Sequence, residues 1–253
     1  MTGIRLRRLG AFLLVLGLAC LQAAPASANV VILGTRVIYH AKDKEVTVQL
    51  QNESSVPALV QAWVSQTMKT QGPDGESVPF VVVPPMARIS PSRGQAMRLS
   101  FTGADLPQDR ESLFWFNLLD VPGVARSPNE AKNELQLAYK SQVKLFYRPT
   151  GLSGSLDDAV KALKLKMEGG KLTLQNDSPF HISLVQASFN DGTRLLPLKS
   201  MDSVMIVPFG ARSVDVKAAD VRQAKSLDII WVNDYGAAQN LALPLAETRE
   251  KGK

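Results

Sequence analysis

The sequence predicts an all-β protein made of two immunoglobulin-like β-sandwich domains. Short stretches of alternating apolar and polar residues fill most of positions 29–150, and turn-forming clusters separate them. A second block with the same pattern follows a linker rich in proline, glycine and serine at 149–154. With 253 residues, of which 45% are hydrophobic, the chain is long enough to bury two cores.

The segment 1–28 has the features of a secretory signal peptide. Arginines at positions 5, 7 and 8 precede an apolar run from 9 to 21, and the Ala-Ser-Ala sequence that ends at Ala28 suits cleavage. A permanent membrane anchor is the alternative, but this run is shorter than the roughly 20 residues that a spanning helix needs. We therefore expect cleavage after Ala28 and export of a soluble protein.

Cleavage would change both the charge and the cysteine content of the chain. The segment carries three arginines and no acidic residue, so the net charge would fall from +6 to +3. That charge is too small to indicate a nucleic-acid partner. The single cysteine, Cys20, would also be lost, so we expect no disulfide even in an oxidising compartment.

The strands of the first domain, which we place at 29–150, are predicted from period-2 alternation between turn signals. Clusters such as GPDG at 72–75 and SPSRG at 90–94 mark where strands end. The expected strands are 30–39, 45–52, 59–67, 78–83, 96–101, 112–119 and 135–147.

The second domain is expected at 151–246 and is followed by a charged, flexible tail at 247–253. Apolar spacing at 156–167 weakly favours a helix. The strands that we expect after it are Lys171–Gln175, 181–189, 193–197, 204–207, 212–216 and 226–233.

The residue types needed for common enzyme chemistry are scarce. His40 and His181 are the only histidines, and no cysteine would remain after export, which excludes zinc and Cys–His sites. No phosphate-binding or dinucleotide-binding glycine motif is present, and no nucleophile elbow. The sequence therefore predicts no enzyme, no metal and no cofactor.

Two cations stand among apolar strand residues. Arg36 lies within the first predicted strand, and Lys144 lies within the strand 135–147. One interpretation is that each side chain extends to the rim of its sheet and keeps its charge in water. The other is a paired site for an anion such as a carboxylate, which arginine and lysine bind well. The pattern alone leaves both interpretations open.

Four segments together resemble the PapD-like family of periplasmic pilus chaperones. The most specific is 106–117, which reads LPQDRESLFWFN and leads to Val121-Pro122. The others are 34–39, GTRVIY; 143–149, VKLFYRP; and 232–236, VNDYG. Their order and separations suit the family, so the resemblance covers nearly all of residues 29–246.

The resemblance implies two immunoglobulin-like domains arranged like a boomerang, with no catalysis. The client is a pilus subunit whose own sandwich lacks a strand, and the chaperone completes it by donor-strand complementation. By family position, Leu135, Leu137 and Tyr139 fill the client's groove, while Arg36 and Lys144 hold its C-terminal carboxylate. An exported adhesion or carbohydrate-binding β-sandwich is the alternative, and it would expose aromatic residues near loop tips.

The resemblance also implies an ion cluster between the domains. Glu111, Arg148 and Asp234 occupy its positions and would hold the interdomain angle; Glu111 as a simple surface acid is the other interpretation. Simple pleating turns Lys144 to the opposite face from Tyr139, which a bulge or strong twist would reconcile. Tyr139 is bulkier than the aliphatic residue expected there, so its entry into a client pocket is left open.

The implied biology is that of the short-loop subgroup of the family. The short segment before residue 135 and the lack of mature cysteines agree with that subgroup. We expect a periplasmic protein that binds pilus subunits and delivers them to an outer-membrane usher. We also expect that the free protein can associate with itself through its apolar strand.

Overall fold

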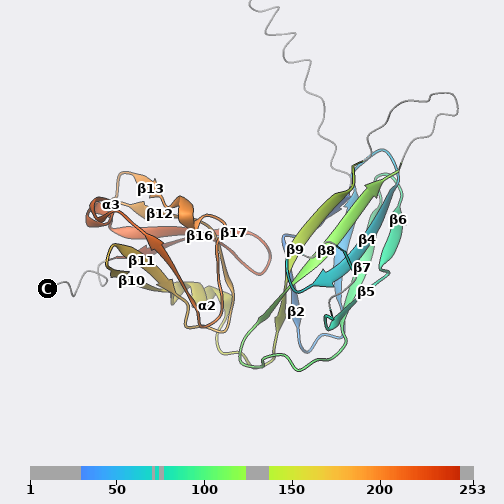
Figure 1. Ribbon diagram of the computed structural model, residues 1–253, viewed down its shortest axis with the longest axis horizontal. Coiled ribbons are helices and arrows are strands. Elements are labelled where there is room, and N and C mark those ends of the chain that lie inside the picture. The colour runs from blue at the N-terminus through green and yellow to red at the C-terminus, as the bar shows by residue number, and fades with distance from the viewer. Residues whose placement is uncertain (1–29, 70–71, 74–76, 124–136, 246–253) are drawn as a thin grey trace, which may run out of the picture.

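The computed structural model describes residues 30–69, 72–73, 77–123 and 137–245, which form two β-sandwiches. Figure 1 shows the sandwiches joined at one end and set at an angle, which is the boomerang arrangement expected from the family. The predicted fold class is therefore confirmed. In the described part of the chain, no helix has the length and apolar content needed to cross a membrane.

The first sandwich packs a four-stranded sheet of order β1-β3-β7-β5 against a five-stranded sheet of order β2-β9-β8-β4-β6. Neighbouring strands are antiparallel except for β2 and β9, which run parallel. The strands are β1 (Val30–Ile32), β2 (Arg36–His40), β3 (Val46–Asn52), β4 (Ala58–Ser65), β5 (Phe80–Val83), β6 (Met86–Ile89), β7 (Gly94–Phe101), β8 (Ser112–Pro122) and β9 (Tyr139–Arg148).

Alternation places one face of each sheet in the core between them. In β8, Phe114, Phe116 and Leu118 are buried there, and in β9 Leu145 and Tyr147 join the same cluster. Residues between these positions face the opposite way because successive strand side chains point to opposite faces. Lys144 and Arg148 therefore share the outer face of β9.

The predicted strand at 30–39 is in fact two strands in different sheets. Val30–Ile32 pairs with β3, whereas Arg36–His40 pairs with β9 in the facing sheet. Gly34 lies between them with φ of +151°, in a region that favours glycine. Because the chain crosses between sheets here, β2 begins only at Arg36.

The strand expected at 135–147 begins later than predicted. It starts at Tyr139, and Leu137 lies two residues before it; Leu135 is outside the described residues. Its pairing with β8 runs without a shift from Tyr139 opposite Asp120 to Tyr147 opposite Ser112. No bulge occurs within β9, so Tyr139 and Lys144 have opposite directions on a regular strand.

The second sandwich has a three-stranded sheet of order β10-β11-β15 and a sheet of order β13-β12-β16-β17, whose β12 also pairs with β14. The strands are β10 (Lys164–Glu168), β11 (Lys171–Gln175), β12 (Ile182–Asn190), β13 (Leu195–Pro197), β14 (Met205–Ile206), β15 (Ala211–Asp215), β16 (Ser226–Val232) and β17 (Ala238–Pro244). The helices are α2 (Leu156–Lys161), η1 (Lys199–Met201) and α3 (Ala218–Gln223).

The sequence interpretation missed three strands and overextended one helix. The helix expected at 156–167 ends at Lys161, and β10 follows it. Ser155 starts this helix by accepting a hydrogen bond from the backbone N–H of Asp158, 3.2 Å away. Besides β10, the strands β6 and β17 were not predicted.

Candidate functional site

Arg36 and Lys144 lie side by side at the junction of the two sandwiches. Arg36 is the first residue of β2, and Lys144 is its direct partner in the parallel pairing with β9. Arg36 Nη1 donates a hydrogen bond to the carbonyl of Val232, 3.0 Å away. Lys144 Nζ donates one to Ser183 Oγ, also at 3.0 Å. Both acceptors belong to the second sandwich.

These two cations have no acidic partner among the described residues, since no carboxylate lies within 4.0 Å of either one. Arg36 Nε is buried without any hydrogen-bond partner. Burial, and secondarily the charge of Arg36, lowers the pKa of Lys144. Burial also lowers the pKa of Arg36, against the opposing effect of Asp234 and Glu111. A bound carboxylate would relieve this excess of positive charge.

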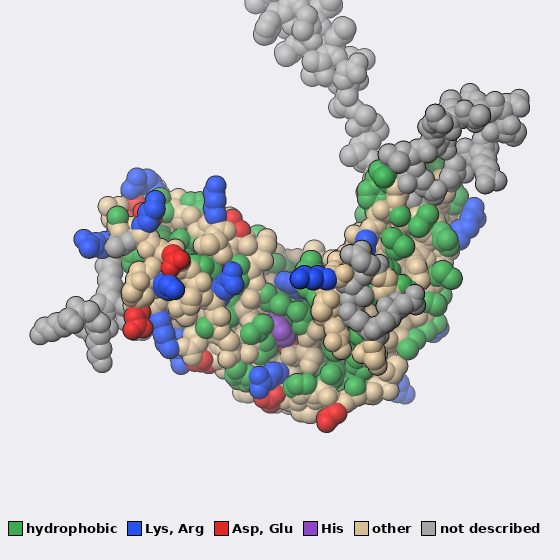
Figure 2. Space-filling view, in the orientation of Figure 1, with side chains coloured by type: hydrophobic (Ala, Val, Ile, Leu, Met, Phe, Trp, Pro, Cys, Tyr) green, Lys and Arg blue, Asp and Glu red, His purple; other side chains and the backbone are tan. Residues whose placement is uncertain are grey.

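The space beside these cations is a cleft of about 400 Å³ between the sandwiches. Figure 2 shows the molecule hollowed where the two sandwiches meet, with Lys and Arg side chains near the bend. Residues of both sandwiches line the cleft, among them Arg36, Trp115, Gln142, Lys144, Ser183 and Val185. A ligand in it would contact both sandwiches.

The N-terminal half of β9 has an open edge. β2 pairs with residues 144–148 of β9, and among the described strands β8 alone forms a ladder with the part of β9 that precedes them. Leu137 and Tyr139 are 49% and 54% exposed at this end. An unpaired edge that carries exposed apolar side chains can accept another strand. This edge leads directly to Arg36 and Lys144.

Glu111, Arg148 and Asp234 meet at the other end of β9, also between the sandwiches. Arg148 Nε donates to Glu111 Oε1 at 2.8 Å. The two terminal nitrogens of Arg148 donate to both Asp234 oxygens at 2.7 and 2.8 Å. The side chains of Glu111, Arg148 and Asp234 are 2%, 12% and 32% exposed. Figure 1 shows the β16–β17 loop, which carries Asp234, reaching towards the first sandwich.

His181 completes this ion cluster and was not predicted. Glu111 Oε2 accepts a hydrogen bond from the backbone N–H of His181 at 2.7 Å and lies 3.2 Å from its Nδ1. Burial lowers the pKa of Arg148, but the hydrogen bonds and charges of Asp234 and Glu111 outweigh burial, and the pKa is raised. In contrast to Arg36 and Lys144, this arginine is neutralised by the protein itself.

Sequence reasoning also missed Ser183 and the carbonyl of Val232. Each comes from the second sandwich, 39 residues from Lys144 in one case and 196 from Arg36 in the other. No local pattern marks such long-range partners. A buried serine in a strand, where an apolar residue is expected, is the one signal that could have drawn attention to Ser183.

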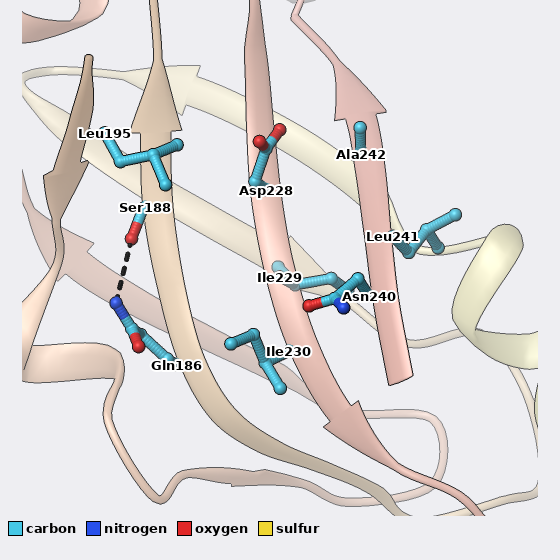
Figure 3. Close-up of a pocket in the computed structure, with 9 residues that line it drawn as sticks. All are labelled: Gln186, Ser188, Leu195, Asp228, Ile229, Ile230, Asn240, Leu241 and Ala242. Atoms are coloured by element: carbon cyan, nitrogen blue, oxygen red, sulfur yellow. Dashed lines mark hydrogen bonds between the residues drawn. The ribbon is translucent and has the colours of Figure 1, made fainter. Parts of the chain in front are cut away.

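A second cavity offers no comparable site. It has a volume of about 360 Å³ on the outer face of β12, β16 and β17 (Figure 3). Gln186 donates to Ser188 Oγ at 3.2 Å, and the Asp228 carboxylate accepts from Asn190 and Ser226 at 2.7 and 2.6 Å. Its main polar groups are thus satisfied within the protein. Across the described residues, no cluster of three His, Cys, Asp or Glu residues could hold a metal.

The aromatic residues give limited support to the carbohydrate-binding alternative. Trp63 and Trp231 are buried in β4 and β16, and Trp115 is half-buried in β8. Tyr235, in the loop between β16 and β17, is by contrast highly exposed, and Tyr139 and Phe209 are about half exposed. These three rings come from different parts of the chain, and the Arg110 guanidinium already packs over the Phe209 ring, 4.9 Å from its centroid.

The fold and the cleft define a protein of two immunoglobulin-like domains with an open strand edge at their junction. Residues 29–153 match the family model described as pili and flagellar-assembly chaperone, PapD N-terminal domain. Residues 158–242 match the pili assembly chaperone PapD, C-terminal domain. The chain therefore belongs to the PapD-like family of pilus-assembly chaperones, whose members are not enzymes.

Individual relatives agree with this assignment. The chain is 40% identical over 227 residues to chaperone protein FimB/FhaD of Bordetella pertussis, covering 85% of this chain and 92% of the relative. The crystal structure of the Pseudomonas aeruginosa CupB2 chaperone aligns with a TM-score of 0.69 and 30% identity, over 85% of this chain and all of that one. The SafB chaperone of Salmonella enterica, solved in complex with the SafA pilin, aligns with a TM-score of 0.71 and 27% identity, over 88% of this chain and 99% of that one.

Proposed function

We propose that this protein is a periplasmic chaperone that captures pilus subunits by donating a β-strand and passes them to an outer-membrane usher. Membership of the chaperone family and the signal-like segment 1–28 support this role. The observation that carries it is an open strand edge that leads to two unneutralised cations. The protein acts by binding, without catalysis or a cofactor, and strand exchange with another subunit drives release.

The open edge is the part that completes the subunit's sheet. A subunit strand that pairs with residues 139–143 of β9 would satisfy backbone groups on both chains. Leu137 and Tyr139, with Leu135 before them, would enter the subunit's apolar groove. Full burial of such a side chain contributes roughly 1.5–3 kcal/mol before ordering costs.

The cations favour one direction for the bound strand. Such a strand would continue the line of β2, which begins at Arg36 and runs parallel to β9. If the subunit strand also runs parallel to β9 and ends at this point, its C-terminal carboxylate arrives between Arg36 and Lys144. A strand of opposite direction would bring its N-terminal end to two positive charges. Charge therefore favours the parallel arrangement and fixes its register.

The ion cluster is assigned a structural role in this proposal. Arg148 links Glu111 of the first sandwich to Asp234 of the second. Separating a buried charge from its partner costs several kcal/mol of folding free energy. The cluster therefore resists changes in the interdomain angle. It thereby keeps the cleft open at a fixed width for the subunit.

The carboxylate clamp is tested with two peptides that differ in a single group. Both carry the C-terminal sequence of a pilus subunit from the same organism; one ends in a free carboxylate and the other in an amide. The wild-type protein, purified from periplasm, is expected to bind the free acid about a hundredfold more tightly in a calorimetric titration. Arg36→Ala and Lys144→Ala should each remove most of this preference.

Two further variants complete the design. Arg98→Ala removes an arginine from the other sheet of the first sandwich, in β7, and should leave binding unchanged. Leu137→Glu should bind both peptides normally but capture less of the intact subunit when the two are co-purified from periplasm, because only the folded subunit carries the groove. Equal affinity of the wild-type protein for acid and amide would refute the clamp, and normal capture of the intact subunit by Leu137→Glu would refute the donated strand.

A further inference from the structure

We propose that Ser183 is a positioning residue for Lys144, so that the second sandwich builds half of the carboxylate clamp. This inference rests on the proposed function of the cleft. Ser183 is only 3% exposed, and its hydroxyl oxygen accepts the hydrogen bond from Lys144 Nζ at 3.0 Å. A serine buried at this depth has lost its water contacts, and Lys144 is the partner that replaces them.

A β-bulge is what turns Ser183 towards the first sandwich. Ala187 and Phe189 of β12 lie in the second core, and plain alternation back from them would also place Ser183 in that core. The pairing of β12 with β16 shifts register between Leu184 and Gln186. Beyond this shift, Ile182 and Leu184 are the core residues, so Ser183 points out of the core. Bulges commonly re-aim a side chain in this way.

Lys144 needs such an acceptor because of its surroundings. Its flexible four-carbon stem allows many positions, and the neighbouring charge of Arg36 repels its ammonium group. The Ser183 hydroxyl holds the ammonium in the cleft before any ligand arrives, which reduces the ordering cost of binding. A hydroxyl also leaves the positive charge uncompensated, whereas a carboxylate at this place would neutralise it.

Arg36 is held in the same manner from the same side. Its Nη1 donates to the carbonyl of Val232, the last residue of β16, while its Nε stays without a partner. Each cation thus receives one uncharged acceptor from the second sandwich. The placement of the second sandwich therefore becomes part of carboxylate recognition, and not only a support for the first.

The test is a double-mutant cycle that uses the free-acid peptide described above. Ser183→Ala should weaken binding about tenfold, while Lys144→Ala should weaken it about a hundredfold. In the Lys144→Ala background, Ser183→Ala should have no further effect, because it acts only through that lysine. Ser183→Thr keeps the hydroxyl and should restore binding to within about twofold of the wild type.

Ser188→Ala is the matched control. Ser188 is a buried serine of the same strand with a hydrogen bond to Gln186, on the other side of the bulge (Figure 3). Its variant should bind normally. If Lys144→Ala loses affinity but Ser183→Ala does not, or if the two losses simply add, the positioning role is wrong while the clamp stands. If Lys144→Ala itself binds the free-acid peptide normally, the carboxylate clamp of the proposed function is wrong, whatever Ser183→Ala does.

Discussion

Lys144 and Arg148 are four residues apart on the same face of β9, yet they occupy opposite electrostatic situations. The Arg148 guanidinium donates hydrogen bonds to the carboxylates of Glu111 and Asp234, with nitrogen–oxygen distances of 2.7 to 2.8 Å. Lys144 has Arg36 as its neighbour and an uncharged hydroxyl as its acceptor. Both positions lie between the sandwiches, so burial alone does not explain the difference.

Under the proposed function, this difference separates a structural charge from a charge that is kept for a ligand. A buried ion pair that is balanced within the chain holds its two sides together and leaves nothing for a partner. Two half-buried cations without an acid lower the stability of the free protein, as the lowered pKa of Lys144 indicates. Such a cost is tolerated at sites where function requires it.

The largest expected effect is a loss of stability in Arg148→Met. This change would leave the Glu111 carboxylate buried without its cation, although the His181 backbone N–H would still bind it. We expect the free energy of unfolding to fall by about 3 kcal/mol, at the lower end of the range for breaking a buried pair. Urea denaturation followed by tryptophan fluorescence measures this loss.

Asp234→Asn provides the comparison within the cluster. Because Asp234 is about one-third exposed and screened by water, its loss should be clearly smaller than that of Arg148→Met. A change below about 1 kcal/mol in Arg148→Met would mean that the cluster does not hold the sandwiches together.

Much of this contrast could be predicted from the sequence, but only because of the family resemblance. Alternation in the predicted strands showed that Arg36 and Lys144 stand among apolar residues, and it left open whether they bind an anion or extend to the rim; the role of Arg148 in an ion cluster came from the resemblance alone. The pattern had no means of assigning an acid to one cation and not to the other. Glu111 and Asp234 are 37 and 86 residues from Arg148.

Stability is expected to respond very differently in Lys144→Met. This variant removes a half-buried cation together with its repulsion from Arg36, and it leaves the Ser183 hydroxyl without its partner. These effects oppose each other, so the free energy of unfolding should change by less than about 1 kcal/mol. The same urea titration applies, with Arg148→Met as the matched variant from the same strand and face. A loss as large as that of Arg148→Met would erase the distinction between the two cations.

The parts that sequence reasoning missed share a physical cause. The strand expected at 30–39 divides because Gly34 lets the chain cross from one sheet to the other, and alternation cannot show which sheet a strand joins. The bulge in β12 that turns the Ser183 side chain towards Lys144 depends on pairing with β16, more than 40 residues away. Local periodicity finds strands, whereas register and sheet membership arise from long-range contacts.

The smallest expected effect is a pH dependence that only the unbalanced cation can produce. Burial and the neighbouring Arg36 lower the pKa of Lys144, so its ammonium loses its proton below the ordinary lysine range. Affinity for the free-acid peptide should therefore fall severalfold as the pH rises into this window, while Lys144→Arg should stay charged and show little change.

Between the lowered pKa and the ordinary lysine value, the unfolded chain binds more protons than the folded one, so this group makes the protein more stable as the pH rises. Weaker binding there cannot be attributed to unfolding caused by Lys144. If the affinity of the wild-type protein stays as constant as that of Lys144→Arg across this pH range, the ammonium charge of Lys144 does not contribute to binding of the peptide carboxylate.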